Sequence, residues 1–392
     1  MTLLKDFSFT AVVAGFVSVL VGFTGAGVIV FQAAQSLGAT PDEIGSWIWA
    51  LGLGMGITSI ALSLRYREPI ITAWSTPGAA LLITAGVGSS MEEAIGGFLV
   101  CAVLIVICGF TGWFEQVMDR VPLSLASAML AGVLLQFGLN TFVAMQTQFV
   151  MVFAMLCVYW VMRQKQPRYA VVSALVLGIL IAGARGLLQL ESLNVQLAQP
   201  VFTRPEFSVS GLIGIALPLF VVTMASQNVP GVATIRAFGY TAPVSPLIGW
   251  TGMATFLLAP FGGFALNLAA ITAAISMGPE AHEDPDKRYV AGVALGVFYI
   301  VIGLFGATVG AVFAALPKEL VSAIAGLALL STIGKSLVAG LADDNEREAA
   351  LLTFLVTASG MTLLGIGSAF WGLATGLLAT GIRRAALRVK RV

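Results

Sequence analysis

Apolar segments of about twenty residues follow one another along almost the whole chain, separated by short stretches that carry the charges and the turn signals. An apolar helix of this length crosses the hydrocarbon core of a bilayer, so the pattern predicts an all-α membrane protein with about fourteen spans. The expected spans cover residues 8–34, 43–63, 69–86, 92–116, 121–139, 141–162, 168–187, 208–237, 243–259, 260–277, 287–315, 317–340, 347–364 and 365–387. For the last two, shorter helices that form a hairpin are the alternative.

The third span is short, and its sequence, "PIITAWSTPGAALL" (69–82), interrupts a helix. Pro77 lacks a backbone N–H and disfavours helical backbone at the residue before it. We therefore expect an extended arm over residues 70–74 and a half-helix that begins near Pro77, with Ser75 or Thr76 as its N-cap. Irregular backbone at membrane depth survives only inside protein or beside a watery cavity.

The tenth span is broken in a similar way, because "PFGGFALNLAAITA" (260–273) carries two adjacent glycines before Asn267, which we place near the start of a second half-helix. The two helix N-termini would then face each other near the midplane, each with free N–H groups and about half a positive charge, which suits an anion or the carbonyl edge of a polar ring. The alternative is a pair of packing kinks, but two breaks in matching places favour the functional interpretation. The residues expected to break the spans are Pro77, Gly78, Pro230, Gly262 and Gly263.

Three consecutive uncharged polar residues, Ser226, Gln227 and Asn228, lie inside the long apolar eighth span. Each step of a helix turns by about 100°, so the three cannot share one face. Burying such groups without partners costs about 2–7 kcal/mol each, so they are not expected to face lipid. They either join neighbouring helices by hydrogen bonds or, as we prefer, contact a substrate through Gln227 or Asn228.

An internal repeat relates the two halves of the chain. "QSLGATP" (35–41) follows the first span, "RAFGYTAP" (236–243) follows the eighth, and one helix and then a broken span come after each. Because seven spans per half is an odd number, the halves would sit upside down relative to each other, as in inverted-repeat secondary transporters. The repeats expected are residues 1–190, with spans 1–7, and residues 205–392, with spans 8–14.

Composition and charge agree with this organisation. The chain is 58% hydrophobic and 10% charged, with a mean hydropathy of +0.97 and a net charge of +1, and nothing in it resembles a nucleic-acid-binding patch. With both termini in the cytoplasm, only Arg185, Arg204 and Lys318 of the 20 basic residues fall outside, as the positive-inside rule requires. The three cysteines lie in apolar spans and predict buried thiols, not disulfides.

Several chemistries are missing. All 19 acidic residues fall in the expected loops or at span ends, and the single histidine, His282, lies in an acidic loop where we expect it to be solvated. The sequence contains no metal-ligand cluster, nucleophile–base set or phosphate-binding loop, so we expect no cofactor, no metal and no enzymatic activity. It also offers no protonatable relay at mid-membrane.

Three segments carry a resemblance to a known family: "REPIITAWSTPGAALL", "MASQNVPGVATIRAFGY" and "PFGGFALNLAAITAAI". Over nearly the whole chain the sequence resembles the benzoate/proton symporter family (the BenE type), which is distantly similar to nucleobase permeases and to sulfate and bicarbonate carriers. The resemblance implies import of benzoate or a similar aromatic carboxylate with a proton across a bacterial inner membrane. It also implies a core domain from spans 1–4 and 8–11, a gate domain from spans 5–7 and 12–14, and a short strand before the half-helix in spans 3 and 10. Related folds often form homodimers, and the sequence leaves the oligomeric state open.

By the same resemblance, the substrate lies between the third, eighth and tenth spans, and Trp74 or Phe264 would contact its ring. The expected substrate-binding residues are Trp74, Ser75, Thr76, Ser226, Gln227, Asn228, Phe264, Leu266 and Asn267. Nucleobase permeases place acidic residues in the eighth and tenth spans, whereas the matching positions here are uncharged, which suits an anionic substrate. The proton would travel on the substrate, or on a span-end group such as Glu68 or Glu115. A nucleobase/proton symporter and an uncoupled organic-anion channel remain the alternatives.

Overall fold

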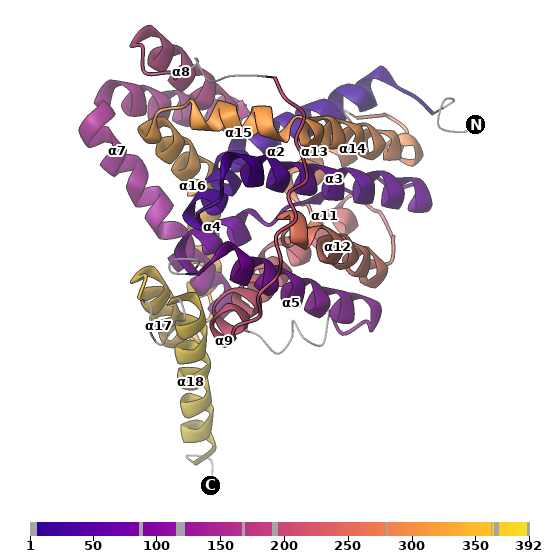
Figure 1. Cartoon of the computed structure of the whole chain (residues 1–392). Coiled ribbons are helices and arrows are strands. Elements are labelled where there is room, and N and C mark those ends of the chain that lie inside the picture. Colours follow the sequence, from indigo (N-terminus) through magenta and orange to yellow (C-terminus); the bar gives the residue numbers. More distant parts are fainter. Residues whose placement is uncertain are drawn as a thin grey trace.

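The computed structural model describes residues 6–85, 89–114, 122–166, 169–189, 195–279, 281–361, 363 and 368–389. They form a bundle of helices that contains one very small sheet (Figure 1). The first half of the chain contains α2 (Phe9–Ser36), α3 (Pro41–Tyr66), β1 (Thr72–Ala73), α4 (Thr76–Ala85), α5 (Met91–Phe110), α7 (Leu123–Lys165) and α8 (Ala170–Ala184).

The second half opens with a long helix that is α-helical in α9 (Val209–Gly211), α10 (Leu217–Thr223) and α11 (Val229–Ala237) and π-helical in η3 (Leu212–Ala216) and η4 (Met224–Asn228). The elements that follow are α12 (Val244–Leu258), η5 (Ala259–Phe261), β2 (Asn267–Leu268), α13 (Ile271–Met277), η6 (Pro285–Lys287), α14 (Tyr289–Leu304), α15 (Gly306–Ala314), α16 (Lys318–Leu341), α17 (Arg347–Ala358) and α18 (Ser368–Val389).

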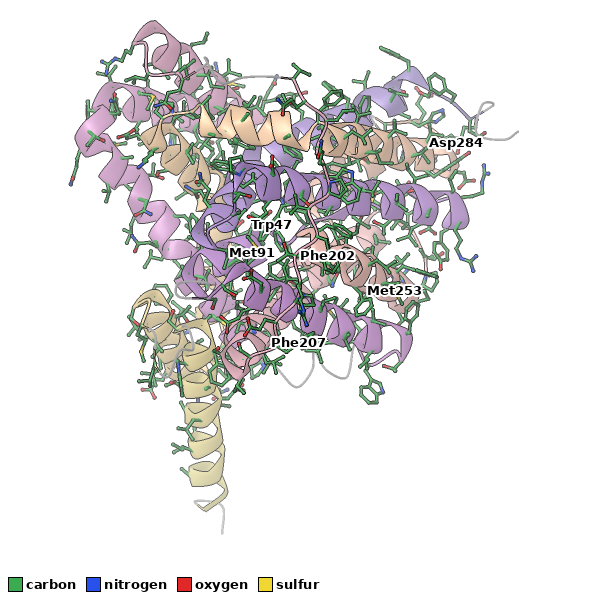
Figure 2. All side chains as sticks on the ribbon, viewed as in Figure 1. Trp47, Met91, Phe202, Phe207, Met253 and Asp284 are labelled. Carbon is green, nitrogen blue, oxygen red and sulfur yellow. The ribbon has the colours of Figure 1, made fainter. Side chains whose placement is uncertain are left out.

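The prediction of a helical, multi-pass membrane protein is confirmed. Within the described ranges, seven helical segments are long and apolar enough to cross a bilayer, and α2, which bends by 42° between Phe23 and Ala26, would be an eighth. Figure 1 shows α3, α5, α12 and α14 side by side on one side of the molecule and α7, α8 and α16 on the other. Side chains lie between these helices over much of the molecule (Figure 2). The pair α17 and α18 lies at one end, and α18 projects from the body.

The predicted boundary between the fifth and sixth spans is wrong. It was placed at Asn140, but α7 continues through that residue and loses helical backbone only at Gln148, where φ is −128° and ψ is 56°. Gln136 and Asn140 both lie within this helix. Gln136 Nε2 donates to Asn140 Oδ1 at 2.8 Å, one turn further along.

The eleventh span also differs from prediction, and the thirteenth takes the shorter form given as its alternative. The eleventh, expected as one helix over residues 287–315, is divided into α14 and α15 at Phe305, where φ is −98° and ψ is 24°. In place of a span over 347–364, α17 has 12 residues and ends at Ala358. A helix of that length rises about 18 Å, less than the thickness of the hydrocarbon core.

The two copies of the sequence repeat fold into the same turn. In the first turn, Gly38 N (φ 79°) donates to Gln35 O and Ala39 N donates to Ala34 O. In the second, Gly239 N (φ 83°) donates to Arg236 O and Tyr240 N donates to Ile235 O. This pairing of a six-to-one bond with a left-handed glycine is a Schellman cap. The repeated motif therefore has one structural role, which is to end a helix and start the next.

Glycines let α3 pack directly against α14. A Cβ at Gly52 would lie 2.7 Å from the Gly303 Cα, and one at Gly56 would lie 2.6 Å from the Gly296 carbonyl oxygen. Such small-residue contacts bring helix backbones together in apolar surroundings. The α3–α14 contact therefore depends on the absence of side chains along one face of α3.

We expect Gly52→Ala to destabilise the protein and Gly334→Ala to stabilise it slightly. Both glycines are helical, but a Cβ at Gly334 meets nothing within 4 Å, so that change brings only the higher helix propensity of alanine, up to about 1 kcal/mol. At Gly52 the clash with the α14 backbone outweighs that gain. Thermal unfolding of the purified variants in detergent measures both, and equal shifts of Tm would contradict the packing argument.

Candidate functional site

The two broken spans meet in a two-stranded antiparallel sheet. Thr72 pairs with Leu268 and Ala73 pairs with Asn267, and Ala269 N donates to Ile71 O at 2.9 Å just beyond the strands. Since backbone groups that leave a helix inside a bilayer need new partners, each arm supplies partners for the other. Segments almost 200 residues apart in sequence are thereby held at one place.

The free edge of β1 is bonded by hydroxyl groups of α3. Thr72 N donates to Ser59 Oγ at 3.0 Å, and Ile70 N donates to Ser63 Oγ at 3.1 Å. The two serines are four residues apart, so they lie on one face of the helix. The sequence analysis missed this role, although small hydroxyl residues one turn apart in an apolar helix were a signal for it.

The arm that leads to β2 is held by α12 and by η4. Leu266 N donates to Thr255 Oγ1 at 3.0 Å, and Leu268 N donates to Asn228 Oδ1 at 2.9 Å. The arm contains Ala265 with φ at 42°, a left-handed conformation that non-glycine residues adopt at a cost of about 1–3 kcal/mol. The Asn228 side chain thus joins the eighth span to the tenth, and the paired strands join the tenth span to the third.

The helix that follows β1 begins as expected, and the one that follows β2 begins later than expected. Ser75 is the N-cap of α4, because its Oγ accepts from Gly78 N at 3.0 Å and its carbonyl accepts from Ala79 N at 2.8 Å. Asn267, expected near a helix start, lies in β2 instead, and α13 begins at Ile271. Before β2 the chain passes through a loop in which Gly262 has φ at 93°, a left-handed conformation that glycine adopts readily.

The polar residues of the eighth span lie in the π-helical turn η4, two residues before Pro230. Val229 N donates to Met224 O, five residues earlier, which makes this turn wider than an α-helical turn. The wider turn accommodates the carbonyl four residues before Pro230, which has no N–H to bond it. Asn228 is fully buried and directed at β2, whereas Ser226 and Gln227 are half-buried. Asn228 therefore bonds β2, while Ser226 and Gln227 lie on a partly accessible face of the helix.

Polar groups without partners gather around this point. Asn267 Nδ2 donates to Ala265 O, but Asn267 Oδ1 is buried without a hydrogen bond within the described part of the chain. The hydrogen bonds of the described residues also include no acceptor for the N–H of Thr76 or for the N–H groups of the first three residues of α13. Ile271, which begins α13, is 72% exposed, so the rest of the described chain does not cover the start of this helix.

The two candidate aromatic residues have different surroundings. Phe264 is fully buried among Trp47 and Phe98, with ring centroids 5.6 and 5.7 Å away. Trp74 lies edge-on to Phe23, with centroids 5.0 Å apart, at the end of β1. Leu266 is also fully buried. Trp74 is buried as well, so contact of Trp74, Phe264 or Leu266 with substrate stays a prediction that burial does not decide.

The span-end acids have other roles or lie outside the described residues. Glu68 accepts from Thr241 N and from Ala242 N, both at 3.0 Å, and so anchors the loop that carries the second copy of the repeat. Both of its oxygens are used in these contacts, which argues against Glu68 as a mobile proton carrier. Glu115 lies outside the described residues.

Sequence comparisons place this geometry in context. Residues 5–382 match the family model described as benzoate membrane transport protein. The chain is 50% identical over 363 residues to the inner membrane protein YdcO of Escherichia coli (strain K12), covering 93% of each chain. It is 42% identical over 378 residues to the benzoate membrane transport protein of Acinetobacter baylyi (strain ATCC 33305 / BD413 / ADP1), covering 96% of each.

Solved structures share the fold at low sequence identity. The transmembrane domain of the cyanobacterial bicarbonate transporter BicA superposes with a TM-score of 0.59 at 12% identity, over 94% of this chain and 97% of that one. The murine Slc26a9 anion transporter in its inward-facing state superposes with a TM-score of 0.61 at 14% identity, over 98% of this chain and 69% of that one. These likenesses concern the fold alone.

We expect Thr255→Val to destabilise the arm before β2. Valine has nearly the same shape but leaves the buried Leu266 N–H without its acceptor, at a cost of about 1–3 kcal/mol. Thr251→Val is the matched control, because its equally buried hydroxyl donates only to Ile248 O within its own helix. Thermal unfolding in detergent compares the two, and a control as damaging as the test variant would refute the assigned role of Thr255.

Proposed function

We propose that this chain, which belongs to the benzoate membrane transport protein family, carries benzoate or a similar aromatic carboxylate together with a proton across the bacterial inner membrane by alternating access. It is a membrane transport protein and not an enzyme. The observation that supports the proposal best is the meeting of two short helices at one uncharged point, around the pair β1 and β2.

The chemistry of that point suits a carboxylate. Free backbone N–H groups at the starts of α4 and α13, and the amide of Gln227, are donors, and a carboxylate only accepts. Within the described residues, no acidic side chain lines the point where the strands meet, so an anion would meet no like charge there. Trp74 offers an aromatic edge for the ring. The substrate-binding residues we propose are Trp74, Ser75, Thr76, Ser226, Gln227, Asn228, Phe264, Leu266 and Asn267.

The mechanism proposed is movement between two bodies. We infer an inverted repeat of seven spans in residues 1–190 and seven in 205–392, with both termini in the cytoplasm. The core would hold the paired strands, and the gate would contain α7 and α16. Two observations support the repeat. Both copies of the sequence motif form a Schellman turn, and two residues separate β1 from α4, as two separate β2 from α13.

We propose that the proton travels on the substrate: the bound carboxylate would take up a proton from water outside, cross as the neutral acid and return the proton to water inside. The span-end acid Glu68 is bonded by two backbone N–H groups, and the described spans offer no acid near the paired strands. A nucleobase/proton symporter is the second candidate within transport, and the absence of acids near the strands speaks against it. An uncoupled organic-anion channel would use the same broken helices without concentrating its substrate.

We expect an imposed pH gradient, alkaline inside, to drive uptake of labelled benzoate into proteoliposomes. One proton per benzoate gives up to about tenfold accumulation per pH unit, since each unit is worth about 1.4 kcal/mol. Because benzoic acid itself crosses lipid, the measurement is the initial rate above that of protein-free liposomes. A protonophore should abolish the gradient-driven rate; a rate that persists would favour the channel, and counterflow with labelled uracil instead of benzoate would favour the nucleobase permease.

We expect Gln227→Asp to weaken benzoate binding by at least about tenfold at neutral pH. A carboxylate about 4 Å from another interacts unfavourably by several kcal/mol at the effective dielectric of a partly exposed site, and water reduces that figure. Gln227→Asn is the control, because it keeps an amide without a charge. Equal affinity in all three proteins, measured by calorimetry, would place the substrate elsewhere.

A further inference from the structure

One buried hydroxyl of the eighth span has no hydrogen-bond partner. Thr223, the last residue of α10, is fully buried, and its Oγ1 makes no hydrogen bond within the described part of the chain. In several other helices the threonine hydroxyl donates to the carbonyl four residues earlier; these residues are Thr58, Thr141, Thr234, Thr255 and Thr353. Thr223 has the same helical backbone, with φ at −64° and ψ at −43°. Its hydroxyl is therefore left for a partner outside its own helix.

The eighth span passes the first turn of α4 on its way to β2. A Cβ at Gly78 would lie 2.6 Å from Leu219 Cδ1, so the Leu219 side chain covers the first turn of α4. Nine residues further along, the same span is bonded to β2 through Asn228. Thr223 lies one turn after Leu219, on the same face of the helix, and about one turn before Gln227. Along the eighth span, Thr223 thus lies between the start of α4 and the paired strands.

The start of α4 by itself offers few donors to a carboxylate. Pro77 has no N–H, and Gly78 N and Ala79 N both donate to Ser75. That leaves the N–H of Thr76, which has no acceptor among the hydrogen bonds of the described residues. A carboxylate has two oxygens, and each can accept two hydrogen bonds. The helix end therefore needs a further donor beside it to hold the anion.

We infer that Thr223 is a further substrate-binding residue, whose hydroxyl donates to the substrate carboxyl group beside the N–H of Thr76. The inference rests on the function proposed above. A hydroxyl without a partner in the protein donates to the anion without first breaking another hydrogen bond, so its full strength contributes to binding. An apolar group in place of the carboxylate would leave both donors unpaired, which makes Thr223 a determinant of specificity. The contact persists in the neutral acid, because its carbonyl oxygen still accepts.

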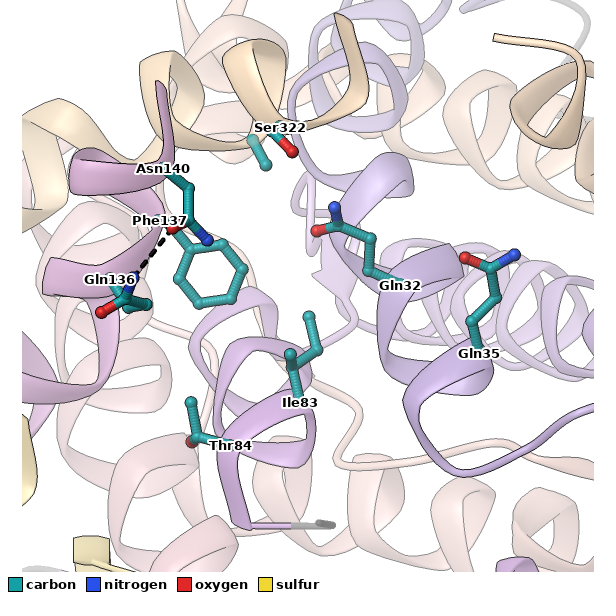
Figure 3. A pocket seen from close by; sticks show the side chains of 9 residues that line it. Gln32, Gln35, Ile83, Thr84, Gln136, Phe137, Asn140 and Ser322 are labelled. Carbon is teal, nitrogen blue, oxygen red and sulfur yellow. Dashed lines mark hydrogen bonds between the residues drawn. The ribbon is translucent and has the colours of Figure 1, made fainter. Parts of the chain in front are cut away.

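The alternative place for a substrate near α4 is at the other end of that helix. An amide-lined cavity of about 210 Å³ is lined there by α2, α4, α7 and α16. Figure 3 shows Gln32 and Asn140 on opposite sides of this cavity, with the Phe137 ring beside Asn140. Thr84, at its wall, is eight residues beyond Thr76, which is about 12 Å along the helix. A change of Gln32 therefore tests the cavity without touching Thr223.

The test removes the hydroxyl of Thr223 and keeps the shape of its side chain. Benzoate binding to the full chain in detergent is measured by calorimetry, and Tm is measured on the same preparations without benzoate. We expect Thr223→Val to weaken binding at least about tenfold, as for other hydrogen bonds to charged groups, and Thr223→Ser to stay within about threefold of the unchanged protein. Because valine removes a hydroxyl that has no partner, Tm should not fall in Thr223→Val.

Thr357→Val is the matched control. The Thr357 hydroxyl is also buried and unpaired within the described part of the chain, but it lies in α17, which packs against α7, α16 and α18. The same chemical change should therefore leave benzoate binding unchanged there. Gln32→Leu, at the amide-lined cavity, should leave it unchanged as well.

Equal benzoate affinity in Thr223→Val and the unchanged protein would overturn the inference, and so would a loss that Thr223→Ser shares. A lower Tm in Thr223→Val would assign the hydroxyl a structural role, and weaker binding in Gln32→Leu alone would place the substrate in the cavity; either result overturns the inference. Thr223→Ala replaces a valine variant that fails gel filtration. If the unchanged protein neither binds nor exchanges benzoate, the proposed function fails and the inference with it. Benzoate binding that is indifferent to Thr223 refutes the inference alone.

Discussion

A backbone that leaves a helix inside a bilayer must find new hydrogen-bond partners, and this chain meets that constraint twice at one place. β1 and β2 bond each other. The hydroxyls of Ser59 and Thr255 and the amide of Asn228 bond backbone groups of the two arms and their flanks. Because each arm is incomplete without these partners, the position of the site follows from the need to satisfy backbone groups.

The helix α3 shows how one element serves packing and site together. Its glycines, Gly52 and Gly56, allow the α14 backbone to approach, while Ser59 and Ser63 bond the arm that contains β1. Gly54 leaves room for Leu266 of the other arm, since a Cβ there would lie 2.5 Å from its Cδ1. A helix made of small residues can thus contact three partners closely without a large apolar side chain at any of these points.

Helix dipoles, not charged side chains, set the electric field at the paired strands in the described part of the chain. In the described spans the paired strands meet no acid, so the partial charges of helix ends and amides dominate the local field. α4 presents its N-terminus to the paired strands and its C-terminus to the amide-lined cavity.

The sequence by itself determined the membrane class, the two broken spans and the polar segment 226–228, because apolar length, proline and glycine act locally. It could not show that Asn267 pairs with Ala73 instead of starting a helix, that Phe264 lies among Trp47 and Phe98, or that α7 continues past Asn140. Only the tertiary structure decided these points. Strand pairing and side-chain satisfaction depend on partners far away in the chain, whose distance no local pattern encodes.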